Sequence, residues 1–160
     1  MPNVMRNIFD TSHLPKHLSE LKKMSLFVEL TAREIKIVHG FMHERKYLKD
    51  EVVFDEGEDG QAIYIILEGK VLICHQGQAE KPIATLESGN FFGELALLDS
   101  APRAAQARAA DDCTLAVFFR GDFLSLMVSH ALIASKIALQ LARHLGARLR
   151  TVVRSDLGPL

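Results

Sequence analysis

Short apolar runs that alternate with glycine-containing turns are the feature that most restricts the fold of this 160-residue chain. The runs lie in the middle of the sequence, at 52–54, 63–67, 71–74, 82–86 and 114–119. Breaks between them include 56–60, 68–69, 76–78 and 88–90, each containing glycine, which supplies the positive φ that tight turns need. Strands this short and this regularly spaced predict an eight-stranded antiparallel jelly roll or barrel.

Helical spacing flanks the strands on both sides. Before them, apolar residues repeat every three or four positions, and Thr31 precedes Glu34 by three, which is a capping-box signature. We expect one helix, beginning at about Leu14, to end near Lys23 and another to run from Thr31 to about Arg45. After the strands comes a stripe broad enough to pack on a barrel, a second helix or both, formed by Ile133, Ile137, Leu141, Leu145, Leu149 and Val152.

The expected fold is therefore mainly β with flanking helices, a β-roll of the jelly-roll type. We divide the chain into an N-terminal helical segment (1–45), a β-roll core (46–120), C-terminal helices (121–154) and a flexible tail (155–160).

Charge and composition restrict the function. The net charge of −1 argues against a general nucleic-acid binder, and we expect no direct DNA binding. Residues 51–102 sum to −8, with +3 before and +4 after them, which we interpret as solvated surface. No apolar run approaches the roughly 20 residues of a membrane span, and residues 1–10 lack the apolar centre of a secretory signal. We expect a cytoplasmic protein with no membrane contact, in which Cys74 and Cys113 are buried and reduced.

Residues 91–105 carry the chemistry. Gly93 precedes a run of helix formers, so the N–H groups at the start of that short helix can bind an anion. Arg103 is followed by two alanines, which leave the backbone N–H groups accessible beside a guanidinium, and charge-assisted bonds of this kind suit a phosphate. The carboxylate of Glu94 would repel a phosphate, so we expect it to accept a hydrogen bond from a sugar hydroxyl. The combination predicts a nucleotide-like ligand.

This stretch resembles the phosphate-binding cassette of cyclic-nucleotide-binding domains, the family of catabolite activator proteins, regulatory subunits of cyclic-AMP-dependent kinase and cyclic-nucleotide-gated channels. The family pattern is present as Phe92-Gly93-Glu94-Leu95-Ala96-Leu97 and Pro102-Arg103-Ala104-Ala105. Similarity extends over roughly residues 18–150, with 54–58, 63–71 and 121–123 also matching family segments.

The resemblance implies a role for each cassette residue. Glu94 would hold the ribose 2′-hydroxyl, Arg103 would pair with the cyclic phosphate, and the N–H groups of Gly93, Ala96 and Ala104 would complete the site. Members that favour cyclic GMP tend to have Thr where Ala104 stands, so cyclic AMP is the expected ligand, with cyclic GMP or a cyclic dinucleotide as alternatives. The same binding stretch includes Phe92, Leu95 and Ala105.

The base contacts are less specific. In the family a residue of the last helix covers the base, and alignment places Arg148 there, where its guanidinium plane can stack on a purine. A solvated Arg148 is the alternative. Ile73, Ile83 and Ala84 are candidates to line the pocket, or else belong to the ordinary core.

Two departures from the family pattern lie outside the anion site. Lys49-Asp50-Glu51 replaces the usual Pro-Gly-Glu, so we expect that turn to lack its usual positive-φ residue. Gln106 stands where the family favours Thr or Ser.

We expect a non-enzymatic sensor whose last helix moves when ligand binds. Because few residues follow position 150, we expect it to act in trans on an unidentified effector protein. A homodimer through that helix is possible, since a heptad-like seam is formed by Ala138, Leu141, Leu145, Leu149 and Val152. Packing of the helix on its own barrel is the alternative, and a scaffold with a vestigial pocket is the alternative function.

A metal or a catalytic centre is not expected. His39 and His43 are spaced i, i+4 on an expected helix, but no HExxH pattern accompanies them, and no Ser/His/Asp or Cys/His set is anchored to a motif. We therefore expect neither a metal nor a cofactor.

Overall fold

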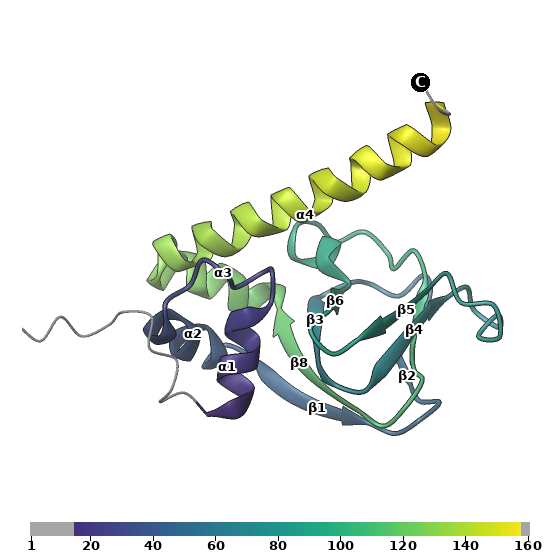
Figure 1. Cartoon of the computed structure of the whole chain (residues 1–160), viewed down its shortest axis with the longest axis horizontal. Coiled ribbons are helices and arrows are strands. Elements are labelled where there is room, and N and C mark those ends of the chain that lie inside the picture. The colour runs from purple at the N-terminus through teal and green to yellow at the C-terminus, as the bar shows by residue number, and fades with distance from the viewer. Residues whose placement is uncertain (1–14, 158–160) are drawn as a thin grey trace, which may run out of the picture.

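The structure, a computed structural model, describes residues 15–157 and contains two antiparallel sheets with helices packed against one of them (Figure 1). One sheet has the order β1 (His43–Tyr47), β8 (Cys113–Phe119), β3 (Ala62–Glu68) and β6 (Phe91–Phe92). The other has the order β2 (Val52–Phe54), β7 (Gln106–Ala109), β4 (Lys70–Cys74) and β5 (Ala84–Glu87). The helices are α1 (Lys16–Lys23), α2 (Ala32–His39), α3 (Arg120–Ser129), α4 (Ala131–Leu157) and the short 3-10 helix η1 (Glu94–Leu97). The expected mainly-β roll with flanking helices is confirmed, as two packed sheets.

Strand β3 belongs to two hydrophobic cores at once. Its odd-numbered side chains Ile63, Ile65 and Leu67 face the helices, and its even-numbered side chains Tyr64 and Ile66 face the interior of the roll. Because alternate side chains of a strand point to opposite faces, a strand buried on both faces must be a continuous apolar run, as the sequence has here.

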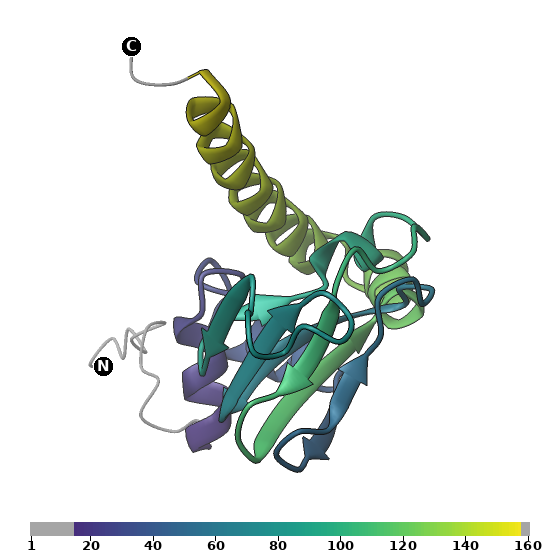
Figure 2. The same cartoon turned by 90° about the vertical axis from the view of Figure 1, so that its right-hand side faces the viewer.

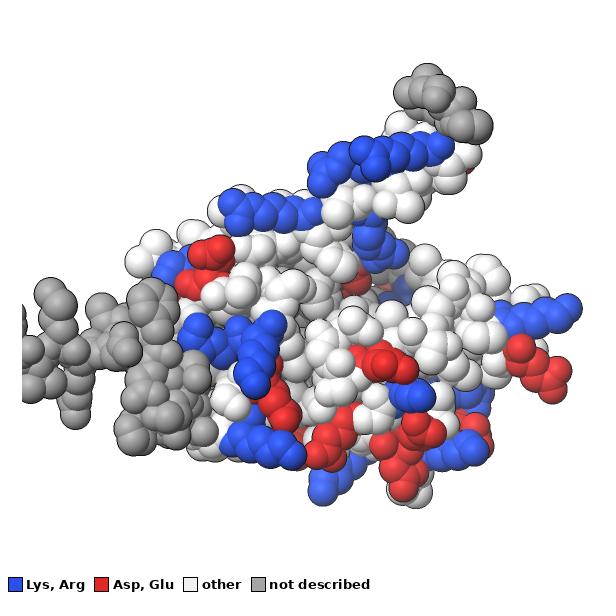
Figure 3. All heavy atoms as spheres, viewed as in Figure 1, with Lys and Arg blue, Asp and Glu red and all other residues white. Residues whose placement is uncertain are grey.

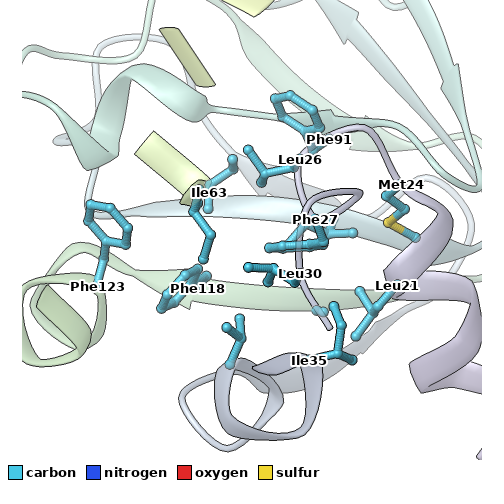
Figure 4. Close-up of a cluster of buried hydrophobic side chains, with 14 of the residues drawn as sticks. Leu21, Met24, Leu26, Phe27, Leu30, Ile35, Ile63, Phe91, Phe118 and Phe123 are labelled. Carbon is cyan, nitrogen blue, oxygen red and sulfur yellow. The ribbon is translucent and has the colours of Figure 1, made fainter. Parts of the chain in front are cut away.

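The helix-side core joins all four α-helices to the sheet. Figure 4 shows Phe27 and Leu30, from the connection between α1 and α2, beside Ile63 of β3 and Phe118 of β8, with Phe123 of α3 at the edge. Phe27 and Phe118 are 1% and 0% exposed, so this cluster fixes the helices to the roll through burial of large side chains.

The expected capping box is confirmed: the Thr31 hydroxyl accepts from the N–H of Glu34, and the Glu34 carboxylate accepts from the N–H of Thr31. Other boundaries differ from expectation. Helix α2 ends at His39 and β1 begins at His43, where the sequence predicted helix to about Arg45. Strands β6 and β7 were not expected either.

Helix α4 is longer than predicted and extends beyond the body of the protein (Figure 2). It includes residues 155–157, which the sequence analysis assigned to a flexible tail. Residues 1–14 and 158–160 lie outside the described residues. The expected helix start at Leu14 and the expected absence of a secretory signal therefore stay predictions. Within 15–157, no helix combines the length and the apolar character that a membrane crossing needs.

In the turn before β2, Asp50 takes the positive φ that glycine usually supplies. Asp50 adopts φ 68°, the left-handed conformation that glycine takes most easily and that Asp and Asn tolerate better than other residues. Its N–H donates to the carbonyl of Ala109, at 2.8 Å. The sequence analysis was therefore wrong that this turn lacks a positive-φ residue.

Candidate ligand-binding site

A cavity of about 480 Å³ opens between the cassette, sheet strands β4 and β5, and helix α4. Its lining contains every residue that the sequence analysis proposed for ligand binding: Phe92, Gly93, Glu94, Leu95, Ala96, Arg103, Ala104, Ala105, Ile73, Ile83, Ala84 and Arg148. Gln106 does not line this cavity. It is 3% exposed, and its side-chain amide donates from Nε2 to Oδ1 of Asp55. The structure thus brings into one cavity proposed residues that are up to 75 positions apart in the chain, from Ile73 to Arg148.

Arg103 is held with its guanidinium pointing inward. Its backbone is fixed by the loop before β3, since its N–H donates to the Glu58 carbonyl at 2.7 Å and its carbonyl accepts from the N–H of Gly57 at 2.8 Å. Its two terminal nitrogens donate to the carbonyls of Gly93 at 3.1 Å and Ala62 at 2.8 Å.

The third guanidinium nitrogen of Arg103, Nε, is buried and has no hydrogen-bond partner among residues 15–157. The guanidinium carbon lies 4.0 Å from the centre of the Phe54 ring, and burial lowers the pKa of Arg103 from its ordinary value. A buried cationic donor left unpaired is costly, so the site is prepared to gain free energy from an anion.

Gly93 is required at the centre of the cassette for two reasons. Its φ of 73° favours glycine, and a Cβ built there would lie 2.6 Å from Nη1 of Arg103. Helix η1 begins directly after it, at Glu94.

The N–H groups of the cassette are only partly free to bind an anion. The N–H of Ala96 donates to the Gly93 carbonyl at 3.2 Å, and its expected role at the anion stays a prediction. Ala104 and Ala105 make no backbone hydrogen bond to any residue in 15–157.

Glu94 is the one acidic side chain buried in the cavity. Its side chain is 6% exposed, and Arg148 of α4 donates from Nη1 to its Oε1. His144, one helical turn earlier on α4, has Nε2 4.0 Å from the same oxygen. Arg148 was expected either to stack on the base or to be solvated. Its side chain is 64% exposed and forms this ion pair with the cassette, and its contact with a base stays a prediction.

His144 is a lining residue that the sequence analysis missed. Its ring centre lies 4.6 Å from that of Phe91, so it packs against the strand that leads into the cassette. The signal in the sequence was its spacing of four from Arg148, which places both side chains on one face of a helix. Phe54 and Leu86, from the roll, also line the cavity and were not proposed.

The two histidines weighed as a metal site do not lie on one helix. His39 ends α2 and His43 begins β1, so the assumed helical i, i+4 pair does not exist. Among residues 15–157 no group of three or more His, Cys, Asp or Glu side chains could hold an ion. Cys74 and Cys113 are buried free thiols, as expected.

Comparison with known proteins decides the family. Residues 44–130, more than half of the chain, match the family model described as cyclic nucleotide-binding domain. This chain belongs to the cyclic nucleotide-binding domain family. The matched part of this cyclic nucleotide-binding domain runs from β1 through α3 and includes the whole cassette.

Two relatives illustrate its neighbours in sequence. The domain is 36% identical over 127 residues to the cyclic AMP receptor protein of Thermus thermophilus, covering 78% of this chain and 59% of that protein. It is 39% identical over 101 residues to a cAMP-dependent protein kinase regulatory subunit of Mycosarcoma maydis, covering 61% of this chain and 19% of the relative. The chain therefore spans less than two thirds of the length of either relative, and both are regulatory or receptor proteins by name.

Solved structures agree in fold. A cyclic nucleotide-binding domain from Methylobacillus flagellatus matches with a TM-score of 0.73 and 25% identity, over 84% of this chain and 76% of that one. The catabolite activator protein of Thermus thermophilus matches with a TM-score of 0.67 and 34% identity, over 81% of this chain and 62% of that one.

Proposed function

We propose that this protein is a cyclic-AMP sensor that binds its ligand without changing it chemically. The observation that carries the proposal is the buried Nε of Arg103, which has no hydrogen-bond partner among residues 15–157, in the same cavity as the buried carboxylate of Glu94. A ligand that satisfies both must offer an anion and, close to it, a hydrogen-bond donor. A cyclic ribonucleotide offers both, in its cyclic phosphate and its 2′-hydroxyl.

The rest of the cavity suits a base. Ile73, Ile83, Ala84 and Leu95 contribute apolar surface around it, and Ile83 is 59% exposed at its rim. An apolar lining with a few fixed polar groups is the usual composition of a small-molecule site. The N–H groups of Ala104 and Ala105, which make no backbone hydrogen bond to the described residues, supply further donors for the phosphate.

The choice of cyclic AMP over cyclic GMP rests on Ala104. Its methyl group cannot form the hydrogen bond that the hydroxyl of a Thr would offer to the guanine amino group. Cyclic GMP and a cyclic dinucleotide remain the competing ligands, and a scaffold with a vestigial pocket remains the competing function.

Titration calorimetry with cyclic AMP, cyclic GMP and cyclic di-GMP tests the proposal. We expect cyclic AMP to bind most tightly, and to be recovered unchanged by chromatography after incubation. Absence of heat with all three ligands would contradict a sensor and favour the scaffold. Arg103→Ala should weaken binding about 100-fold, the loss of a buried charged partner.

Because Arg103 also bridges Gly93 and Ala62, Arg103→Lys serves as a second variant that keeps a cation in the cavity. Arg33→Ala on α2, an exposed residue, is the control for the change in net charge. Normal binding by Arg103→Ala would show that the phosphate lies elsewhere.

The output of the sensor, as proposed here, is a movement of α4 that is transmitted in trans to an effector protein. Helix α4 contacts the ligand cavity through His144 and Arg148, and it leaves apolar side chains exposed for a partner: Leu132, Leu139, Leu149, Val152 and Val153. A pull-down with and without cyclic AMP tests whether the bound partner depends on the ligand.

A homodimer through α4 is the second part of the partner proposal. The seam expected from the sequence needs revision, because Leu141 is 1% exposed and packs on its own body. The exposed residues Leu132, Leu139 and Val153 are separated in turn by seven and fourteen positions, which are multiples of the heptad repeat. Light scattering coupled to size-exclusion chromatography tests it, and a monomer at tens of micromolar would contradict a homodimer.

A further inference from the structure

Gln106 is a buried polar residue that the ligand cavity does not account for. It is the first residue of β7 and follows the cassette directly, at a position where the family favours Thr or Ser. It is almost fully buried, yet it lies outside the lining of the cavity. Burying an amide is costly unless both of its ends are hydrogen-bonded, so its partners indicate what it does.

Both ends of the Gln106 amide have partners. Nε2 donates to Oδ1 of Asp55, in the turn that follows β2. Oε1 accepts from Nε of Arg108 at 3.3 Å and from Sγ of Cys74, the residue opposite on β4, at 3.7 Å. Because the oxygen faces two donors and the nitrogen faces a carboxylate, only one orientation of the amide satisfies all of these contacts.

The contact with Asp55 completes a ring of hydrogen bonds beside the cassette. The carbonyl of Asp55 accepts from the N–H of Glu58 at 3.3 Å, and the carbonyl of Glu58 accepts from the N–H of Arg103 at 2.7 Å. The N–H of Gly57 donates to the Arg103 carbonyl at 2.8 Å. This turn is therefore fastened to the cassette twice, through the backbone at Arg103 and through the side chain of Gln106.

Ala104 and Ala105 lie between these two fastened positions. Both residues line the cavity, and their N–H groups make no backbone hydrogen bond to the described residues. A two-residue segment that makes no such bonds of its own takes its position from the residues on either side. The direction of these two N–H groups therefore depends on Gln106 as well as on Arg103.

The same contact holds a negative charge away from the anion site. The turn carries four carboxylates, those of Asp55, Glu56, Glu58 and Asp59. Figure 3 shows that the roll carries acidic side chains on its surface, whereas basic ones follow α4. All four residues of the turn lie outside the cavity lining, and Asp55 is bonded to β7 through Gln106. A carboxylate nearer to a bound phosphate would weaken binding by repulsion.

We propose that Gln106 is a positioning residue for the phosphate of the ligand, because through Asp55 it fixes the N–H groups of Ala104 and Ala105 beside Arg103. The inference rests on the proposed function, since it takes a cyclic phosphate as the anion bound there. Gln106 acts without touching the ligand. Loss of its contact with Asp55 leaves Arg103 in the cavity and weakens binding through the two neighbouring donors.

An exchange of the two polar groups tests the proposal. Gln106→Glu keeps the shape of the side chain but sets two carboxylates against each other, so cyclic AMP should bind about tenfold more weakly in titration calorimetry. Adding Asp55→Asn supplies an amide that donates in the reverse direction and restores the original net charge. The double variant should bind cyclic AMP within about twofold of the unchanged protein, since the two substitutions are coupled.

Gln78→Glu is the matched control, because it is the same substitution at an exposed position between β4 and β5. It should leave the affinity for cyclic AMP unchanged. Should Gln106→Glu fail to fold, which urea denaturation reports, Gln106→Asn takes its place. Its amide is one methylene shorter and cannot reach Asp55, so it should also weaken binding.

The amide NMR resonances of Ala104 and Ala105, recorded without nucleotide, measure the position of the two donors separately from affinity. They should shift in Gln106→Glu and return toward their original values in the double variant. Both variants carry the same substitution at position 106, so only the contact with Asp55 differs between them. The resonance of Ile35, buried on α2, should stay in place and so exclude a general loss of structure.

The outcomes separate the two levels of inference. If cyclic AMP does not bind the unchanged protein but the two alanine resonances follow the exchange, the proposed function fails and the positioning of the loop by Gln106 stands. If cyclic AMP binds and Gln106→Glu has the affinity of the control, or the double variant regains nothing, the positioning role alone is overturned. A loss of affinity without a shift of the alanine resonances would show that Gln106 acts through charge, which also overturns it.

Discussion

Lys136 of α4 donates to both carboxylate oxygens of Glu34 on α2, at 2.9 and 3.0 Å. The same carboxylate accepts from the N–H of Thr31, at 2.8 Å. One acidic side chain thus caps α2 and ties it to the base of α4, so the two helical segments that flank the roll in sequence are joined in space.

This ion pair gives the first prediction. Burial raises the pKa of Glu34, but the hydrogen bonds from Thr31 and Lys136 outweigh it, so the pKa lies below its ordinary value. A depressed pKa contributes stability that is complete above the unfolded value, about 4.3, and is lost as pH falls through the folded value. Glu34→Gln should lower the free energy of unfolding by about 1–2 kcal/mol at neutral pH, measured by urea denaturation.

The cost should shrink as the pH falls through the lowered pKa of Glu34, because the protonated carboxyl, like the Gln amide, carries no charge. Glu29→Gln, at an exposed position in the connection before α2, is the control and should change stability little at either pH. A cost that is independent of pH would show that the charge of Glu34 is not what stabilises the contact.

Gly93 and Gly77 form a matched pair for the second prediction. Both have positive φ, 73° and 76°, but an added Cβ meets Arg103 at Gly93 and nothing within 4 Å at Gly77. Gly77→Ala should cost about 1 kcal/mol from backbone strain alone. Gly93→Ala should cost more and should also weaken cyclic-nucleotide binding, measured by calorimetry. Equal costs with intact binding would contradict the close approach.

Asp50 provides the third prediction. A backbone φ of 68° costs less free energy for glycine than for aspartate, so Asp50→Gly should raise the free energy of unfolding by up to about 1 kcal/mol. Lys49→Gly, at a neighbouring position without positive φ, should lower it, because glycine adds only unfolded-state entropy there. Thermal denaturation of the two variants beside the unchanged protein checks the sign.

The fourth prediction concerns the base. Ala104→Thr should tighten cyclic GMP binding by about fivefold, the value of one hydrogen bond, with little change for cyclic AMP. Ala104→Val has the same shape without the hydroxyl and should give no gain. If both variants improve cyclic GMP equally, packing and not hydrogen bonding is responsible.

The cassette could be found from the sequence because its function depends on a contiguous pattern. Gly93, Glu94 and Arg103 are close in the chain, so their roles can be inferred from residue type and spacing alone. The ion pair of Arg148 with Glu94 could not be found, since it depends on where the end of α4 lies relative to the roll. The sequence predicted Arg148 in the cavity but assigned it to the base.

The missed strands have a common cause. Strand β1 is His43-Glu44-Arg45-Lys46-Tyr47, exposed along most of its length, and it exists because it pairs with β8 and not because of an apolar pattern. Strand β7 alternates small residues, with Ala107 and Ala109 directed inward, and alanine gives a weak strand signal. Pairing with a neighbour is a tertiary effect that local periodicity does not contain.

The double burial of β3 makes the helices and the roll one thermodynamic unit. Ile63 and Ile65 are part of the helix-side core, while Tyr64 and Ile66 are part of the roll, and all four share one stretch of backbone. Detaching the helices would expose one face of a strand whose other face still holds the roll together. The two cores therefore melt together, and a ligand that stabilises the cassette raises the resistance to unfolding of helices it never touches.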